Sequence, residues 1–132
     1  MSEVLKFLQD NKVFYLATVG DDNQAHVRPL GFVMEYKGKL AFCTSNQKDM
    51  YKQMEKNPKV EITCIDDKYN TLRLSGKFIS CTNKESQQKA LDIMPMLSNM
   101  YSVDDGKFEI FALDNAKAYC MDMTGHKKEL TV

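Results

Sequence analysis

The sequence contains no tryptophan, only three prolines and no excess of either charge, since 18 Lys and Arg residues balance 18 Asp and Glu residues. Proteins that coat nucleic acids or anionic membranes usually carry a basic excess. We therefore expect neither kind of partner, and any anion that the chain binds must be held by a local pocket. A chain of 132 residues is long enough for one domain with its own hydrophobic core.

Long apolar runs are also absent, so no segment has the length of a membrane span. The N-terminal residues MSEVLKFLQDNK mix polar and apolar side chains, unlike a signal or transit peptide. No CxxC pair or zinc-type Cys/His spacing occurs among the four cysteines, which are Cys43, Cys64, Cys81 and Cys120. The sequence therefore predicts a cytoplasmic protein with reduced, structural thiols and no metal site.

Periodicity predicts a mainly β protein. Strands are expected over residues 13–19, 24–36, 40–44, 60–65, 72–81, 108–113 and 116–121, and helices over residues 3–11, 47–56 and 83–98. Most connections are too short for a parallel crossover, which favours antiparallel pairing. We expect a small antiparallel barrel of six or so strands with two to three peripheral helices. It forms a single domain, 1–132, in which residues 120–132 are expected to be a loosely held tail.

Arg28-Pro29-Leu30 is the first of two segments that indicate a binding site. Pro29 lacks a backbone donor, so this strand should lie at an edge or contain a bulge. The residue before a proline is held extended, which fixes the direction of Arg28. Backbone groups that remain unpaired there could face a flat polar ligand. The alternative is a solvent-facing arginine beside a proline that interrupts the edge.

Thr44-Ser45-Asn46-Gln47-Lys48 is the second segment, where a strand ends and a helix begins. The first turn of a helix presents unpaired N–H groups that suit a phosphate. Thr44 and Ser45 add hydroxyl groups, and Lys48 adds a cation that opposes the helix dipole unless an anion is bound. The alternative is an ordinary N-cap with a solvated lysine.

Together these segments, with Asn57-Pro58 at the end of the second helix, make residues 3–121 resemble the pyridoxamine-phosphate-oxidase-like, FMN-binding split-barrel family. The resemblance implies an FMN-binding homodimer with each flavin between two subunits, acting as an oxidoreductase on a small molecule. It implies that the backbone around Arg28, Pro29 and Leu30 borders the isoalloxazine ring and that Thr44, Ser45 and Lys48 hold the phosphate. The Arg28 side chain could reach either the phosphate or the ring. A flavin carrier or sensor without turnover, and a haem- or deazaflavin-binding barrel, are the alternatives.

The sequence departs from the true pyridoxamine phosphate oxidases, which are longer and carry a C-terminal element containing Arg and Trp. This chain has no Trp, and its last eight residues, GHKKELTV, contain no Arg. It is more similar to short members of the family, which include nitroimidazole-reductase-like and general-stress-like proteins. No Ser/His/Asp set, carboxylate pair or Walker loop is recognisable, so no catalytic side chain is assigned. A flavin performs hydride and electron transfer itself.

Three further features have two interpretations each. His26 shares one side of its strand with Arg28, and it is either a structural histidine or a proton donor near the cofactor. Arg73 and Lys77 form either a solvated strand face or part of a dimeric flavin site. The Met94–Tyr101 cluster either packs in the core or dimer interface or forms a mobile wall over the substrate.

Overall fold

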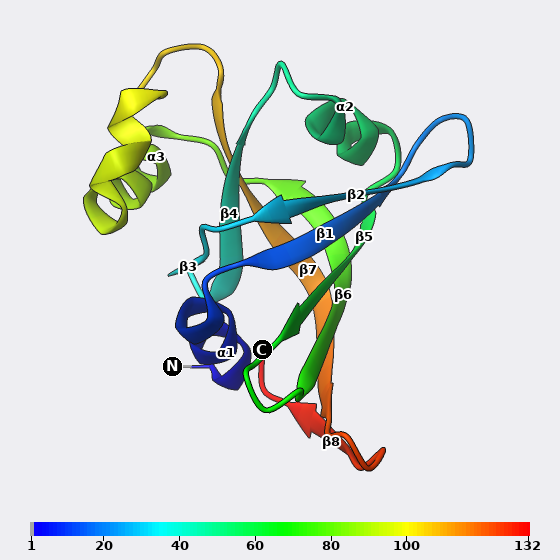
Figure 1. Ribbon diagram of the computed structural model, residues 1–132. Coiled ribbons are helices and arrows are strands. Elements are labelled where there is room, and N and C mark those ends of the chain that lie inside the picture. Colours follow the sequence, from blue (N-terminus) through cyan, green and yellow to red (C-terminus); the bar gives the residue numbers. More distant parts are fainter. Residues whose placement is uncertain (1) are drawn as a thin grey trace.

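The computed structural model describes residues 2–132, and its main feature is one antiparallel sheet that curls into a barrel (Figure 1). Its strands are β1 (Phe14–Val19), β2 (Ala25–Leu30), β3 (Met34–Tyr36), β4 (Lys39–Ser45), β5 (Lys59–Ile65), β6 (Thr71–Ser80), β7 (Phe108–Met121) and β8 (Lys127–Leu130). They run in the order β2-β1-β5-β6-β7-β4-β3, and β8 pairs with β7. Because β2 and β3 lie at opposite edges of the sheet, the barrel is split, which confirms the predicted fold class.

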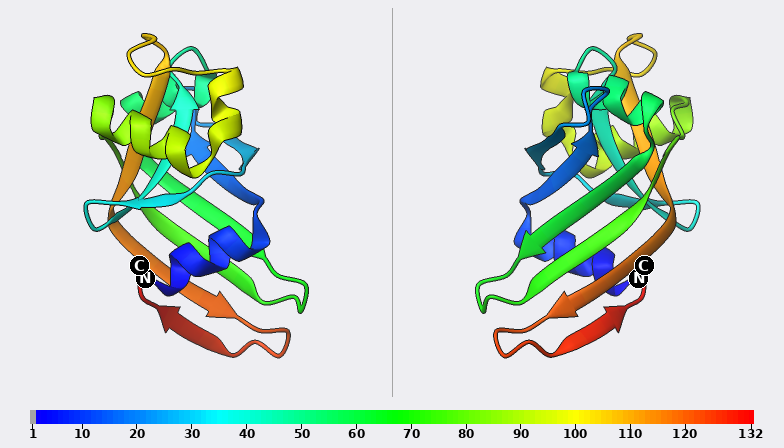
Figure 2. Two further views of the ribbon diagram at one scale, coloured as in Figure 1. Left: turned by 90° about the vertical axis from the view of Figure 1, so that its left-hand side faces the viewer. Right: turned by 90° about the vertical axis from the view of Figure 1, so that its right-hand side faces the viewer.

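Helices accompany the sheet at both ends and on one side. Within residues 2–132 they are α1 (Glu3–Asn11), α2 (Asp49–Lys56), α3 (Lys84–Ile93) and the short 3-10 helix η1 (Pro95–Asn99). Helices α1 and α2 lie at opposite ends of the barrel (Figure 1, Figure 2). Helix α1 begins where Ser2 Oγ accepts the Leu5 N–H at 3.0 Å, a regular N-cap. No helix in the described part of the chain is long and apolar enough to span a membrane.

The single strand predicted over residues 24–36 is two strands, so this prediction was wrong. After β2 the chain crosses through residues 31–33 to the other edge of the sheet, where β3 pairs with β4. Phe32 and Val33 are buried in two different core clusters, and their burial holds the crossing in place. Pro29 lies opposite Tyr15 in an edge strand, which confirms the predicted position of the proline.

The helix predicted over residues 83–98 is shorter than expected. Its start is fixed by a capping box between Asn83 and Ser86. It ends at Ile93 because Met94 leaves the helical conformation, with φ −129° and ψ 83°, and Pro95 follows. Proline disfavours the α conformation in the residue before it, so the chain continues as a short 3-10 helix instead.

The two strands predicted over residues 108–113 and 116–121 are one 14-residue strand, β7. Asn115 adopts a positive φ of 51°, and the register with β6 shifts between Ser75 and Lys77. A bulge of this kind bends a strand without ending it. As a result, β7 pairs with β4, β6 and β8 and belongs to both halves of the barrel.

The tail predicted to be loosely held, residues 120–132, is part of the sheet, so this prediction was also wrong. Strand β8 pairs with β7, and Leu130 packs against the main core cluster. Thr131 O accepts the Val4 N–H at 3.2 Å, which places the two termini side by side (Figure 2). The polar composition of the tail is that of a hairpin strand with one exposed side.

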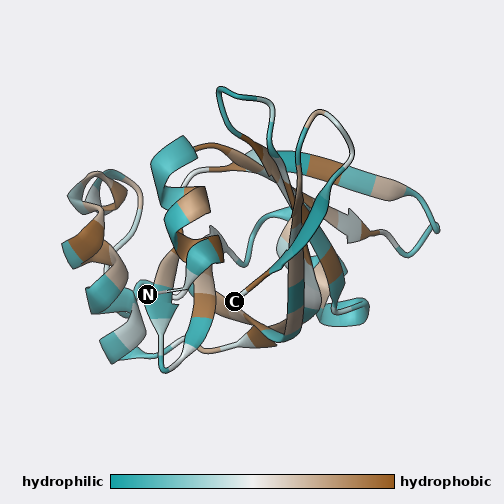
Figure 3. Ribbon diagram, turned by 90° about the horizontal axis from the view of Figure 1, so that it is seen from below, coloured by the Kyte–Doolittle hydropathy of each residue, from teal (hydrophilic) through white to brown (hydrophobic). Residues whose placement is uncertain are grey.

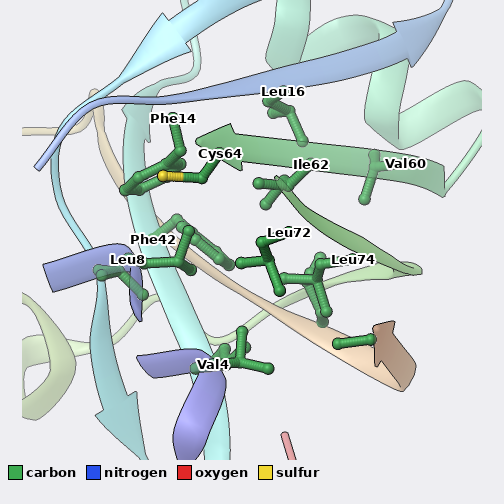
Figure 4. Close-up of a cluster of buried hydrophobic side chains, with 14 of the residues drawn as sticks. Val4, Leu8, Phe14, Leu16, Phe42, Val60, Ile62, Cys64, Leu72 and Leu74 are labelled. Carbon is green, nitrogen blue, oxygen red and sulfur yellow. The ribbon is translucent and has the colours of Figure 1, made fainter. Parts of the chain in front are cut away.

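A cluster of buried apolar side chains fills the barrel (Figure 4). Phe14 contacts Phe42 with 5.8 Å between ring centroids, and Phe42 stacks on Phe111 at 5.4 Å. Phe78 continues the row from Phe111 to Tyr51 of α2, with 5.6 Å between centroids at each step. This aromatic row, from Phe14 to Tyr51, connects four strands to α2.

A second cluster lies between the sheet and the α3–η1 segment. Strand β4 contributes to both clusters because its side chains alternate: Phe42 faces the barrel and Ala41 faces the second cluster. Teal and brown segments accordingly alternate along several strands in Figure 3. The members of the second cluster are Phe32, Met34, Tyr36, Ala41, Ala90, Leu97, Tyr101, Phe108, Ile110 and Ala112.

Substitution of Leu130 by Ala tests whether β8 belongs to the folded core. Loss of this half-buried side chain should lower the free energy of unfolding by about 1–2 kcal/mol. Glu129→Ala is the matched control, because Glu129 is exposed on the same strand and should change stability by no more than about 0.5 kcal/mol. Urea unfolding measures both effects. Equal stability of the wild type and both variants would support a loosely held tail.

Candidate functional site

Thr44, Ser45 and Lys48 all lie at the corner between β4 and α2. Because side chains alternate along a strand, the Thr44 side chain lies on the Phe42 side of β4 and the Ser45 side chain on the opposite side. Thr44 and Ser45 are the last residues of β4 and are buried, whereas Lys48 is exposed and is the N-cap residue of α2. The Lys48 N–H donates to Ser45 O at 3.1 Å and closes the turn. The first N–H groups of a helix lack intrahelical acceptors, so backbone donors and hydroxyl groups meet at this corner.

Lys48 precedes α2 as its N-cap residue, whereas the helix predicted over residues 47–56 would have placed it inside the first turn. The helix begins at Asp49, so the first turn carries an acidic residue that complements the helix dipole. The Lys48 side chain has no acceptor with which to cap the helix, but it is exposed at the helix start, where its ammonium group can meet an anion. Burial raises the pKa of the neighbouring Cys43 thiol to about 12, and the positive charge of Lys48 opposes this shift.

The Thr44 hydroxyl is the feature of the corner that indicates a ligand. Within residues 2–132, its Oγ1 is a buried polar atom with no hydrogen-bond partner. Such an atom is costly unless it is satisfied. Ser45 Oγ accepts the Gln47 N–H at 3.2 Å, which leaves its own proton available for donation. The Thr44 hydroxyl group, the helix N–H groups and the Lys48 ammonium group are donors that fit the phosphate of FMN, whereas a contact from Ser45 stays a prediction.

Arg28 is directed into the protein and already has several acceptors. Its Nη1 donates to Thr18 Oγ1 at 2.7 Å and to Leu16 O at 3.2 Å, and its Nη2 donates to Gln53 Oε1 at 3.0 Å. Loss of hydration lowers the pKa of Arg28, and the negative charge of Asp49 partly offsets this effect. Arg28 therefore connects the edge strand β2 to β1 and α2. The alternative interpretation, a solvent-facing arginine, does not hold.

Pro29 and Leu30 lie on opposite sides of β2. Pro29 is exposed, whereas Leu30 is half-buried against the main core cluster on the same side of the strand as Arg28. The structure therefore does not place these three side chains on one surface. A ligand bordered by all three would have to contact their backbone, as the resemblance implies.

Arg73 lies on the exposed face of the sheet and forms an ion pair. Its Nε donates to Glu61 Oε1 at 2.7 Å across β5 and β6. Both residues line a hollow of about 700 Å³, together with Tyr119 and Lys127. The Lys127 ammonium group lies 4.2 Å from the centroid of the Tyr119 ring. In the single chain Arg73 thus belongs to a solvated, ion-paired face, and its role in a dimeric flavin site stays a prediction.

His26 lies on the side of β2 that Arg28 occupies, as predicted, but its ring faces the β1–β2 turn. His26 Nε2 is 3.6 Å from Asp22 Oδ1. A Cβ atom at Gly20 would lie 2.7 Å from the same nitrogen, so Gly20 leaves the space that the ring occupies. This arrangement favours the structural interpretation of His26.

The Met94–Tyr101 cluster is divided between core and surface. The Tyr101 ring is buried and stacks on Phe108 with 4.6 Å between centroids, which fits the packing interpretation. Met96 and Met100 expose 68% and 58% of their surface. A wall over a substrate therefore stays a prediction for these two methionines only.

The four cysteines are free, and burial raises the pKa of each thiol. A raised pKa reduces the thiolate fraction and hence the reactivity, which agrees with the predicted structural role. Within the described residues, no group of three or more His, Cys, Asp or Glu side chains is arranged to hold a metal ion.

Sequence reasoning missed the polar residues that support the corner from within. Thr18 Oγ1 donates to Gln53 Oε1 at 2.6 Å, beside the Arg28 contacts. Tyr51 donates its hydroxyl to Glu109 Oε1 at 3.0 Å. No motif marks these residues, because each fits the pattern of its helix or strand. One signal was present: Glu109 is a carboxylate in an otherwise apolar stretch of a strand.

Comparisons with known proteins agree with this architecture. A family described as pyridoxamine 5'-phosphate oxidase matches residues 1–121. A NimC/NimA family protein from Clostridium acetobutylicum is 39% identical, with a TM-score of 0.91 over 98% of this chain and 90% of that chain. No curated protein matches the chain.

Two more distant solved structures share the fold. A pyridoxamine 5'-phosphate oxidase-related, FMN-binding protein from Nostoc punctiforme is 14% identical, with a TM-score of 0.61 over 97% of this chain and 92% of that chain. The haem storage protein HutZ from Vibrio cholerae is 18% identical, with a TM-score of 0.67 over 86% of this chain and 90% of that chain. At these identities the similarity shows the fold alone.

Substitution of Arg28 by Ala should destabilise the flavin-free protein. Hydrogen bonds from a charged group contribute roughly 1.5–3 kcal/mol, and the half-buried guanidinium group has three protein acceptors within 3.2 Å. Arg73→Ala is the matched control, since this exposed arginine pairs with one carboxylate and should contribute about 0–1 kcal/mol. Urea unfolding without flavin compares the two. An Arg28→Ala protein as stable as the control would contradict the tethering role.

Proposed function

The chain belongs to the pyridoxamine 5'-phosphate oxidase family, and we propose that it binds FMN and acts as a flavin-dependent oxidoreductase on a small molecule. The observation that carries this proposal is the corner between β4 and α2. There the unpartnered Thr44 hydroxyl, the Ser45 hydroxyl and the exposed Lys48 side chain precede the first turn of α2. The FMN-binding protein of the same fold supports flavin as the ligand.

In this proposal the chain binds and orients the cofactor. Bound FMN supplies hydride and electron transfer. Thr44, Ser45 and Lys48 hold its phosphate, and the backbone of residues 28–30 borders the ring. Arg28 keeps β2 aligned with α2 through Gln53, so the two parts of the site keep a fixed separation. No protein side chain is required for the redox step itself, and we assign none.

The substrate is a small molecule other than pyridoxamine phosphate. In this chain the C-terminal segment forms the short hairpin strand β8 and contains neither Trp nor Arg. The vitamin phosphate carries two negative charges that an arginine would meet in bidentate fashion. The 39% identical relative is a NimC/NimA family protein, which supports placing this chain with the short reductase-like members.

A homodimer is the proposed assembly, with each flavin between two subunits in the cytoplasm. Large apolar side chains lie exposed on the outer face of β1, β2 and β5. Tyr15, Val19, Val27 and Ile65 each expose between 36% and 68% of their surface. Contiguous exposed apolar surface commonly marks an interface. This face includes Pro29, so a second subunit would cover the exposed side of the Arg28–Leu30 segment.

Absorbance, titration and solution mass test this proposal in one preparation. We expect flavin bands, saturable FMN binding and a mass of two chains, followed by bleaching of the flavin bands when NADH or NADPH is added. Bound FMN that no nicotinamide reduces would favour a carrier or sensor. An intense haem band, or binding of a deazaflavin alone, would favour those ligands. No binding of any of them would contradict the proposal.

Lys48→Ala should weaken FMN binding about 10- to 150-fold, because a charge-assisted phosphate contact contributes roughly 1.5–3 kcal/mol. Riboflavin lacks the phosphate, so its affinity should stay the same. Lys52→Ala is the matched control, since Lys52 is exposed one turn further along α2. Fluorescence titration with both flavins measures the effect. Equal FMN affinities for the wild type and Lys48→Ala would remove Lys48 from the phosphate site.

A further inference from the structure

Glu109 of β7 lies beside the corner and connects its two sides. In the sheet it is the register partner of Thr44 on β4. Its carboxylate accepts three side-chain hydrogen bonds, from Asn46 Nδ2 at 2.9 Å, Tyr51 Oη at 3.0 Å and Thr82 Oγ1 at 2.9 Å. These donors come from the β4–α2 turn, from α2 and from the segment after β6. One carboxylate thus gathers three separate parts of the chain.

We propose that Glu109 is a positioning residue for the phosphate-binding corner: it holds Asn46 and Tyr51 so that the Thr44 hydroxyl group and the start of α2 face one ligand. This inference rests on the proposed function. Glu109 itself does not contact the ligand in this proposal. It acts through the residues on either side of Lys48.

Asn46 is fixed on the strand side of the corner. It lies two residues after Thr44 and two before Lys48. Its Nδ2 donates both to Glu109 Oε2 and to Gly106 O, each at 2.9 Å, and its backbone N–H donates to Lys107 O at 3.0 Å. Both side-chain protons are used, so the amide has one orientation. These bonds fix the position of Asn46, from which the turn that contains Lys48 begins.

Tyr51 is fixed on the helix side of the corner. Its backbone N–H donates to Lys48 O at 3.2 Å, in the first turn of α2. Its ring is buried at the end of the aromatic row and packs against Phe78. Burial, followed by the hydrogen bond to Glu109, raises the pKa of Tyr51 to about 12, so the phenol remains a donor. The helix start is thereby held at a set distance from β7.

A carboxylate beside an anion site needs an explanation, because like charges repel. Here three donors from the protein hydrogen-bond to the Glu109 oxygens, and these bonds stabilise the negative charge within the protein. Thr82 is itself oriented, since its Oγ1 accepts the Ile110 N–H at 2.9 Å. A neutral amide could not replace the carboxylate. It offers one oxygen instead of two, and its NH₂ group would face another donor.

Helix α2 is held from a second direction as well. Arg28 of β2 donates to Gln53, two residues after Tyr51. The contacts of Glu109 and Arg28 come from different strands, so α2 can neither slide nor rotate without breaking one of them. Glu109 is the contact closer to the helix N-terminus, and it should therefore govern binding of the phosphate rather than of the flavin ring.

Glu109→Gln, titrated with FMN and with riboflavin, tests this inference. We expect FMN affinity to fall roughly tenfold, because the corner donors lose their alignment, while riboflavin affinity stays within about twofold. Tyr51→Phe removes a single donor and should lower FMN affinity several-fold in the same selective way. It keeps the test available if Glu109→Gln does not fold. Glu85→Gln is the matched control, since Glu85 accepts a tyrosine hydroxyl from Tyr36 at 3.0 Å outside the corner.

The ratio of FMN to riboflavin affinity separates positioning from general structural support. An equal loss for both flavins would mean that Glu109 only stabilises the fold, and unchanged affinities for both would mean that it has no role at the corner. Either result overturns the inference while the proposed function stands. A wild-type protein that binds FMN no more tightly than riboflavin would instead remove the phosphate site itself, and the inference with it.

Discussion

Tyr51 joins the hydrophobic core of this protein to its polar corner. Its ring is the last member of the aromatic row that begins at Phe14, and its hydroxyl donates to Glu109. Packing of the row fixes where α2 meets the sheet, and the hydrogen bond fixes how its first turn faces β4. The core of a protein is densely packed and transmits displacement. Site geometry and core packing are therefore coupled through this one side chain.

The two sides of the sheet have different roles. On the inner side, Arg28 and Glu109 form hydrogen bonds within the chain, to Gln53 and Tyr51 of α2 among others, and support the corner. On the outer side, large apolar side chains and the Arg73–Glu61 pair are open to the surroundings. This division fits the proposed function, in which the protein would supply a phosphate site and an apolar surface and a flavin would perform the redox chemistry.

Much of the architecture follows from local patterns in the sequence. Alternating apolar residues predicted the strands, and Pro29 predicted an edge strand because proline lacks a backbone donor. The predictions that failed depend on long-range contacts. The periodicity of apolar residues could not predict the crossing at residues 31–33, because its apolar residues Phe32 and Val33 pack into two different clusters. The polar tail became strand β8 because β7 offered an unpaired edge and Leu130 a place in the core.

The sequence alone determined the split-barrel family and placed Thr44, Ser45 and Lys48 at one corner, because these residues are neighbours along the chain and need only a strand end followed by a helix. The tertiary structure decided where Arg28 points and which residues support the corner. Gln53 and Glu109 are separated by 25 residues or more from their hydrogen-bond partners Arg28 and Thr82, respectively. Such contacts depend on how strands pair and helices pack, and no local pattern encodes a hydrogen bond between distant elements.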